Sequence, residues 1–389
     1  RGIVSHMHEA GLPVEILTTC VKEFTADWSV NFHKPGVTVE RGVTIRRFPV
    51  RKREDLAGYA KVNDKLMRGE IPLTSREEEI FLTEMVNSPE LYAYIREHKA
   101  EYGSFVFIPY MFGTTYHGVQ ECFEKAVMIP CFHDEAYVYL EAFKKVFPRV
   151  AGMIHLAEPE AQLARRVYDL SGVKSEALGA GVDSDWAVRI PEADAGKAGA
   201  KGYCPERFRD QYGIHDPFLL YAGRKEKGKN IDSLLAMFAR YRREHPEKPL
   251  KLVLLGGGRV RIPDSVRGDV LDAGFVDLQD KYDAYGASLA LCQPSKNESF
   301  SIVIMESWLA ERPVLVHDGC AVTKNFAKES GGGFAFRDYV DFEAQVSFLY
   351  DREDTARAMG ALGREYVLRN FTWDIIVEKY RTFLEEIES

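Results

Sequence analysis

Short apolar segments that alternate with helical patterns constrain the fold of this chain more than any other feature. In the first half, apolar runs of strand length lie at residues 14–18, 43–48, 105–109, 127–130 and 152–155. In the second half, such runs lie at residues 218–222, 250–255, 270–273, 289–292 and 313–316. A helix between two strands carries the chain back across the sheet, so that the strands run parallel. The sequence therefore predicts an α/β protein with parallel sheets.

The length of 389 residues and one aperiodic segment indicate how the domains divide. A chain of this length is expected to form two or three domains. Residues 190–202 are rich in Ala, Gly, Asp and Glu and have no hydrophobic period, which is typical of a linker. We predict a first domain at 1–202, a second at 203–371, and a C-terminal segment at 372–389 that contains an amphipathic helix.

Two parts of the first domain depart from a simple Rossmann-like pattern. The chain begins in a helical pattern, whereas a Rossmann-like domain has a strand and a glycine-rich turn before its first helix. We therefore expect a further segment to precede residue 1. Residues 56–101 form a long helical insert, in which Thr74 and Glu77 have the spacing of a capping box.

Composition narrows the class of protein. The formal net charge of −8 argues against a nucleic-acid-binding protein with a basic face. The six cysteines are scattered without a Cys-x-x-Cys pair, which favours free thiols in a reducing cytosol over a disulfide or zinc framework. No apolar run approaches the roughly 18 residues that a membrane span needs, and no signal peptide is visible.

A basic loop follows the predicted strand at 218–222. It reads Gly-Arg-Lys-Glu-Lys-Gly-Lys-Asn, and a helix begins after it. Ligands of α/β folds bind at the carboxyl ends of the strands, where Arg can grip a diphosphate with two N–H groups and Lys adds a point charge. Arg224 and Lys229 are the candidate pair, with Lys227 as a competitor for the second position. A solvated run of charges is the alternative for this loop taken alone.

Two carboxylates, Glu298 and Glu306, flank a short polar turn that leads into an apolar helix. A turn whose backbone N–H groups open a helix is a ready anion site. Acids beside such a site bind hydroxyl groups rather than the anion itself, as recognition of a sugar nucleotide would require. The alternative for Glu306 is an acid placed near a helix start by the helix dipole.

The string from Pro294 to Glu306 resembles the Glu-seven-residues-Glu motif of retaining GT-B glycosyltransferases of family four, the group 1 glycosyl transferases. The resemblance implies that Arg224 and Lys229 hold the donor diphosphate, Glu298 the donor sugar, and Glu306 the ribose hydroxyls. Ser299, Phe300 and Ser301 stand where the family usually has Gly-Phe-Gly. Serines keep the backbone N–H groups, although they narrow the space beside them.

The same resemblance assigns further site residues. Family members place backbone groups near the nucleotide or its phosphates at Gly223, Gly257, Phe275, Val276 and Ile302. In the first domain, the family carries a His-Asp or similar pair after a buried strand, here at His133, whose ring is expected to face the transferred sugar. A structural histidine is the alternative for His133.

The implied fold is GT-B, with two Rossmann-like domains facing across a cleft and the C-terminal helix crossing back to the first domain. The implied enzyme is a retaining hexosyltransferase that needs no metal and no cofactor. It would move a sugar from a UDP- or GDP-sugar to a glycan or lipid-linked glycan, in cell-envelope polysaccharide synthesis. Two alternatives stay open: a sugar-nucleotide 2-epimerase of the same fold, and a non-catalytic protein that binds nucleotide sugars.

Location and acceptor choice follow from weaker signals. The expected location is cytoplasmic, with a peripheral contact to the inner face of the membrane through residues 143–149, or else an ordinary solvated surface there. The insert at 56–101 contains acids (Glu77, Glu78, Glu79) and aromatic residues (Phe81, Tyr92, Tyr94). We expect it to lie beside the cleft and shape acceptor choice, and a helical buttress is the alternative.

Overall fold

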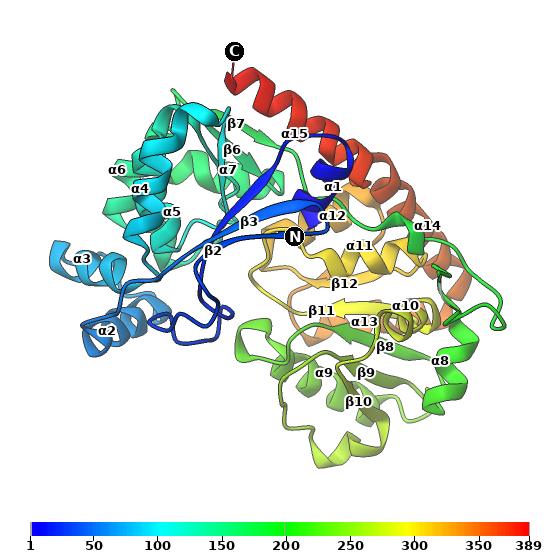
Figure 1. Ribbon diagram of the computed structural model, residues 1–389. Helices are drawn as coiled ribbons and strands as arrows, with labels where there is room; N and C mark the ends of the chain where they lie inside the picture. Colours follow the sequence, from blue (N-terminus) through cyan, green and yellow to red (C-terminus); the bar gives the residue numbers. More distant parts are fainter. Residues whose placement is uncertain (1, 198, 389) are drawn as a thin grey trace. The chain divides into compact units, whose positions relative to one another are not determined.

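The computed structural model describes residues 2–197 and 199–388 (Figure 1). The chain folds into two units, each with its own core. The first contains the residues up to Gly181 together with those from Asp374 onward, and the second contains Val182–Trp373. By this division, residues 182–202 lie in the second unit. Each unit is α/β with a parallel sheet, as the alternation of apolar runs predicts.

The second unit is built on a six-stranded sheet with the order β10–β9–β8–β11–β12–β13, in which all neighbours run parallel. The strands are β8 (Phe218–Ala222), β9 (Lys251–Leu255), β10 (Val270–Gly274), β11 (Ala290–Gln293), β12 (Val314–His317) and β13 (Gly333–Phe336). The helices are α8 (Pro205–Tyr212), α9 (Ile231–Glu244), α10 (Leu278–Ala287), α11 (Ile302–Leu309), α12 (Ala321–Ser330), α13 (Tyr339–Asp351) and α14 (Glu353–Asn370).

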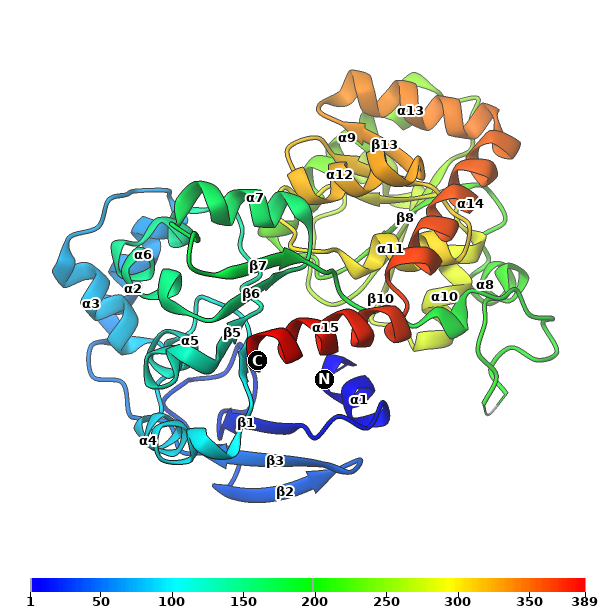
Figure 2. The same ribbon diagram turned by 90° about the horizontal axis from the view of Figure 1, so that it is seen from above.

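Helices cover both faces of this sheet, with α9 and α13 on one side and α10, α11 and α14 on the other (Figure 2). Central strands are therefore buried on both faces, which is why β8 and β9 read as continuous apolar runs rather than as alternating ones. From β8 the chain winds outward through β9 to β10, and from β11 it winds the opposite way through β12 to β13. The order thus reverses between β8 and β11, the point at which open α/β sheets bind ligands.

The first unit contains a four-stranded parallel sheet, β4–β5–β6–β7, and a three-stranded sheet, β1–β3–β2, in which only β2 runs antiparallel. The strands are β1 (Glu15–Thr19), β2 (Gly36–Glu40), β3 (Val43–Phe48), β4 (Phe105–Phe107), β5 (Ala126–Met128), β6 (Gly152–His155) and β7 (Lys174–Ala177). The helices are α1 (Gly2–Glu9), α2 (Leu56–Met67), α3 (Ser75–Glu84), α4 (Pro89–His98), α5 (Gly113–Gly118), α6 (Glu141–Val146) and α7 (Glu158–Val167).

The insert at 56–101 forms α2, α3 and α4, and the capping box at the start of α3 is present as predicted. Three of the six side chains named for an acceptor surface, those of Glu78, Phe81 and Tyr92, are buried instead. Phe81 and Tyr92 are buried in the core of the first unit. The carboxylate of Glu78 is also buried and accepts the backbone N–H groups of Glu141 and Ala142, each at 2.8 Å, at the start of α6. These contacts favour the buttress over the acceptor-binding role.

Helix α15 (Trp373–Glu388) returns the end of the chain to the first unit (Figure 2). The hydroxyl of Tyr380 donates to the carbonyl of Gly179 at 2.7 Å, and Phe383 is buried. The C-terminal helix therefore packs on the first unit, as the GT-B fold requires.

The membrane-facing role predicted for residues 143–149 is wrong for its aromatic members. Phe143 and Phe147 are fully buried, and their rings stack 4.7 Å apart in the core. Phe143 and Val146 form the buried face of α6, and Lys144 and Lys145 lie outside that face, which is the pattern of an amphipathic helix. None of the helices in the described ranges is both long and apolar enough to cross a membrane.

Candidate active site

The predicted donor residues of the second unit gather at one edge of its sheet. The loops that carry them follow β8, β9, β10 and β11, so all of them leave the carboxyl ends of neighbouring parallel strands. The loop after β8 and the loop after β11 flank the point where the strand order reverses. Residues far apart in the sequence therefore meet where the fold favours a ligand.

The basic loop contains one buried lysine (Lys225), one half-buried lysine (Lys229) and two exposed basic residues (Arg224 and Lys227). Lys225 is buried, and its ammonium group contacts Asp272 Oδ1 at 2.6 Å and donates to the carbonyl of Gly256 at 2.5 Å. It thus ties the loop after β8 to the loop after β9 and to strand β10. Arg224 is 63% exposed, with Glu226 3.6 Å away. The sequence did not single out Lys225, because adjacent lysines in a loop have no period that separates the buried one from the rest.

Lys229 and Glu298 meet directly. The Lys229 ammonium lies 2.8 Å from Glu298 Oε1, and the amide of Gln293 donates to the same oxygen at 3.2 Å. Asn230, in the left-handed conformation at φ 56°, donates its side-chain amide to the carbonyl of Pro294 at 3.1 Å. The loops after β8 and β11 are therefore locked together by an ion pair and a hydrogen bond. This pairing brings together two of the residues that the sequence singled out.

The turn before α11 has an open helix start. Ser301 adopts φ 68°, and its buried hydroxyl has no hydrogen-bond partner among the described residues. A positive φ is costly for residues with a Cβ atom, which is the physical reason a glycine suits this position. Ile302 begins the helix with an exposed side chain, and the first N–H groups of a helix have no partner within it. Half-buried Ser299 lies in the same turn.

The side chain of Phe300 belongs to the core of the second unit. Its ring is only 3% exposed and packs against Phe326 and Phe371, with ring centroids 5.4 Å and 5.2 Å apart. Phe300 therefore anchors the turn in the core of the second unit, and only its backbone remains for a ligand. An aromatic residue between two serines in a loop gave no sign of this burial.

Glu306 is buried as well, whereas a side chain that binds the ribose hydroxyls is expected to be reachable by solvent. The residue is 7% exposed. Its carboxylate lies 2.6 Å from the Lys281 ammonium and accepts the hydroxyl of Tyr285 at 2.9 Å and that of Tyr282 at 3.4 Å. Burial, together with the nearby carboxylate, raises the pKa of Tyr285 well above its usual value. Sequence reasoning missed these three partners, because they lie on α10 and meet Glu306 only through helix packing.

Close backbone packing requires glycine at two of the three positions in the turn after β9. A Cβ on Gly256 would lie 2.1 Å from the carbonyl of Gly223, and one on Gly258 would lie 2.6 Å from that of Lys225. Gly257, the predicted ligand position, has no neighbour that a Cβ would meet. A glycine here is therefore not demanded by the protein's own packing.

Phe275 stands out beside this turn because its ring is 90% exposed at the carboxyl end of β10. Val276 follows it and is half-buried. A large apolar ring left in water next to a polar edge is available to stack on a planar ligand.

His133 lies in the loop after β5 of the first unit. Its side chain is 33% exposed, and its Nδ1 lies 3.6 Å from Glu135 Oε1. The neighbouring Asp134 is engaged with Arg166 and accepts the hydroxyl of Tyr139. The histidine is thus neither buried in the core nor fixed by a strong partner, and its predicted role toward the transferred sugar stays a prediction.

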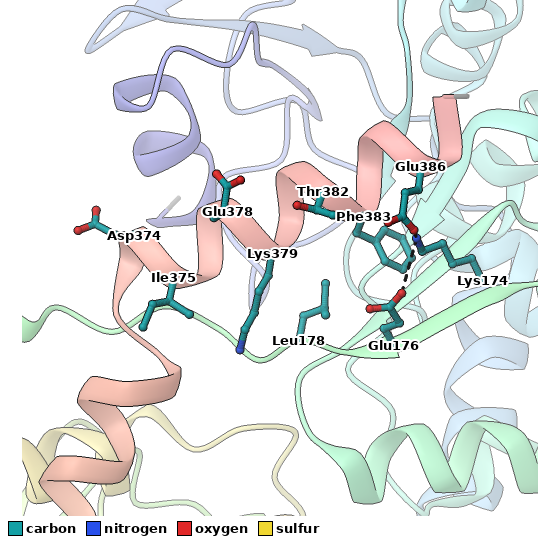
Figure 3. Close-up of a pocket in the computed structure, with 10 residues that line it drawn as sticks. All are labelled: Lys174, Glu176, Leu178, Asp374, Ile375, Glu378, Lys379, Thr382, Phe383 and Glu386. Carbon is teal, nitrogen blue, oxygen red and sulfur yellow. Dashed lines mark ion pairs between the residues drawn. The ribbon is translucent and has the colours of Figure 1, made fainter.

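A cavity of about 560 Å³ lies between β7 and α15 in the first unit (Figure 3). It contains none of the predicted site residues. Lys174 lies 3.6 Å from Glu176 and also pairs with Glu386, so its charge is matched by two carboxylates (Figure 3). Within the described ranges, no group of three His, Cys, Asp or Glu side chains is gathered closely enough to hold a metal ion.

The second unit matches a known family. Residues 216–352 fit the family model described as "Glycosyl transferases group 1". A D-inositol 3-phosphate glycosyltransferase of Corynebacterium kroppenstedtii is 26% identical over 185 residues, which are 43% of this chain and 40% of that relative. The chain thus matches less than half the length of this curated relative.

Solved structures match over most of the chain. Sucrose-phosphate synthase from Thermosynechococcus elongatus has a TM-score of 0.68 at 16% identity, and the match covers 100% of this chain and 92% of that one. HepE from Anabaena, in complex with UDP and glucose, has a TM-score of 0.61 at 13% identity, over 89% of this chain and 87% of that one. At these identities the likeness establishes the fold.

The parallel sheets, the returning C-terminal helix and the structural matches define a protein of the GT-B class. The family match within the second unit adds the particular group: residues 216–352 match the group 1 glycosyl transferases, which confirms the resemblance to that group.

Proposed function

We propose that this protein is a retaining glycosyltransferase that moves a sugar from a nucleotide-diphosphate sugar to a hydroxyl group of an acceptor. The observation that carries the proposal is the ion pair between Lys229 and Glu298 at the switch point of the family-matched unit. A cation for a phosphate and an acid for sugar hydroxyls are held side by side, next to a helix start with open N–H groups.

In this proposal the donor lies along the carboxyl edge of the second unit's sheet. Arg224 and Lys229 bind the diphosphate, and Gly223 and Gly257 let the backbone approach it. Phe275 and Val276 contact the base, for which the exposed ring of Phe275 is suited. The UDP and glucose held by HepE, a protein of the same fold, support a UDP-sugar as donor.

Glu298 and Glu306 act differently in this arrangement. Glu298 accepts hydrogen bonds from the hydroxyl groups of the donor sugar. Its Oε1 binds Lys229, and its Oε2 can accept a hydrogen bond from a sugar hydroxyl. The carboxylate of Glu306 is surrounded by Lys281, Tyr282 and Tyr285, so its contact with the ribose is made from within that network. Backbone N–H groups of Ser299, Phe300, Ser301 and Ile302 face the phosphates and the sugar.

Transfer then proceeds by stabilising charge on the leaving group. The bond between the anomeric carbon and the diphosphate oxygen breaks, and the acceptor oxygen forms its bond on the same face of the sugar. The acceptor proton passes to an oxygen of the leaving phosphate. Arg224, Lys229 and the start of α11 hold the negative charge that develops there, so no metal ion is required.

The first unit supplies the acceptor side in this proposal. His133 is placed toward the transferred sugar, and its half-exposed, loosely held ring leaves it free for such a contact. The acceptor is a glycan or lipid-linked glycan of the cell envelope, and the enzyme acts in the cytoplasm or at the inner face of the membrane. The curated relative is named for a polyhydroxylated acceptor that carries a phosphate, which supports a polar acceptor.

The test is a donor screen followed by a transfer assay. UDP-, GDP- and dTDP-sugars are compared by thermal shift, since a bound donor raises apparent stability. The stabilising donor is then incubated with envelope glycan extracts, and the anomeric configuration of the product is read by NMR. Product formation that requires an acceptor, with retained configuration, supports the proposal. Conversion of the donor sugar without any acceptor indicates a 2-epimerase, and binding without turnover indicates a non-catalytic protein; either result rejects the proposal.

A further inference from the structure

The second unit has a cavity at the amino ends of its strands, opposite the end where the proposed donor residues lie. Its volume is about 300 Å³. Among its lining residues, Pro217, Leu289 and Arg312 stand one or two positions before β8, β11 and β12, so the cavity lies at the amino ends of these strands. The proposed donor residues follow the carboxyl ends of the sheet. The two sites are therefore separated by the length of the strands.

Positive charge is in excess in this cavity. Four guanidinium groups line it, those of Arg189, Arg209, Arg312 and Arg357. Two carboxylates, those of Glu206 and Glu353, line it as well, which leaves an excess of two positive charges. His215 also lines the cavity. We call this site the arginine cavity.

Two of the arginines are fixed by backbone carbonyls instead of by acids. Arg312 donates Nε to the carbonyl of Gly286 at 2.9 Å and Nη2 to the same oxygen at 2.5 Å. Arg209 donates Nη2 to the carbonyl of Ala287 at 2.7 Å. Both carbonyls belong to the end of α10, where a helix attracts cations. Burial lowers the pKa of Arg209 and of Arg312, and for Arg312 the neighbouring Arg357 acts in the same direction.

The other two arginines sit at the mouth of the cavity and are held by exposed acids. Arg357 donates to Glu353 at 2.6 Å, one helical turn away on α14, and Arg189 pairs with Glu206. The pKa of Glu353 is lowered first by its bond with Arg357 and then also by Arg312 and Arg209, so three guanidinium groups act on this one carboxylate. Exposed pairs of this kind contribute little stability and exchange partners readily.

We propose that the arginine cavity binds a small phosphate-bearing molecule, at a site separate from the sugar-nucleotide site. Guanidinium groups match the oxygens of a phosphate in bidentate fashion. Here two are held by backbone carbonyls, and the other two form exposed ion pairs that a phosphate can replace. The concave shape and the volume favour a free phosphorylated metabolite over a flat lipid surface. Arg312 retains the two N–H bonds of Nη1 and one of Nη2 for this contact.

The experiment measures phosphate binding to the full chain by calorimetry, with potassium chloride at equal ionic strength as reference. It is run in an Arg224→Gln background, which weakens phosphate binding at the proposed donor site. The test variant adds Arg189→Gln and Arg357→Gln, both at exposed positions. The matched control adds Arg369→Gln instead, because Arg369 forms the same kind of exposed pair with Glu365 on the same helix.

We expect saturable phosphate binding that the double substitution weakens at least tenfold and that Arg369→Gln leaves unchanged. A hexose phosphate should bind to the same variants in the same order. Equal binding to the double variant, or no binding beyond that of chloride, overturns the proposal. Vesicles containing phosphatidylglycerol form a separate arm: binding to vesicles that depends on Arg357, without binding of free phosphate, also overturns it. Arg357→Gln alone serves if the double variant unfolds.

Discussion

Replacing Glu306 by Ala tests whether this acid is part of the fold as much as of the site. The substitution leaves the Lys281 ammonium and the Tyr285 hydroxyl without the partner they have at 2.6 Å and 2.9 Å. The charged contact is partly open to solvent, because the Lys281 side chain is 28% exposed, so it contributes at the low end of about 1.5–3 kcal/mol. The fully buried Tyr285 hydroxyl, left unpaired, costs about another 1–3 kcal/mol. We expect a total loss of about 2.5–4.5 kcal/mol.

The assay is urea unfolding followed by fluorescence, with the midpoint compared between wild type, Glu306→Ala and Glu306→Gln. The amide of Gln keeps an oxygen that accepts the Tyr285 hydroxyl but cannot pair with Lys281 as an ion. Glu306→Gln should therefore recover about half of the loss. A Glu306→Ala protein as stable as the wild type would refute the reasoning, because it would mean that the buried network carries no net stability.

Three other substitutions or titrations follow from the same contacts. Arg224→Ala should leave the melting temperature unchanged, because the side chain is 63% exposed. The dissociation constant of the donor should rise by tens of fold, because one charge-assisted contact is lost. Unchanged donor affinity in calorimetry would contradict this prediction. Ser301→Gly should raise stability by roughly 0.5–1 kcal/mol in urea unfolding, because it relieves the left-handed conformation at φ 68°. Glu77 should titrate near pH 2 in an NMR titration, because the bond from Lys65 and then the capping contacts of Thr74 lower its pKa to about 2. The stabilising contacts of its carboxylate are thus fully present above pH 4.5 and are lost as the pH falls through about 2. Lys65→Met should raise the pKa of Glu77. A wild-type Glu77 that titrates at pH 4.5 would contradict this prediction.

The sequence predicted those parts of the fold that have an apolar period. Strand β6 and strand β8 begin and end at the predicted residues, because both are buried on either side. Strand β2 was not predicted, since all five of its residues are exposed and no apolar run marks it. Strand β7 has the polar sequence Lys-Ser-Glu-Ala at a sheet edge, and β13 starts with glycine, so neither has the pattern of a buried strand.

For the candidate site, motif spacing identified which loops converge but not how deeply each side chain is buried. Lys229 and Glu298 were chosen as separate ligand groups, and the fold joins them. Phe300 and Glu306 were assigned to the same surface, yet both point into the second unit. Burial of a side chain in a turn or a short helix depends on the packing of distant elements, here α10 for Glu306 and α12 for Phe300, and local sequence contains no record of that packing.

The charges at the carboxyl edge of the sheet explain how donor binding and catalysis would be linked. Lys225 is fully engaged by Asp272, and Lys229 is engaged by Glu298, so among the lysines and arginines of the loop after β8 these two cations are already matched. In the proposed donor complex, a diphosphate at this edge contacts Arg224 and the start of α11. To reach Lys229 it must share that ammonium with Glu298, and the carboxylate is then free to accept the sugar hydroxyls that arrive with the phosphate. In this exchange the ammonium gains a phosphate and the carboxylate gains sugar hydroxyls, so neither charged group is left without a hydrogen-bond partner. The pair therefore holds both groups in place before the donor arrives, which is how preorganised charges lower the barrier to departure of a leaving group.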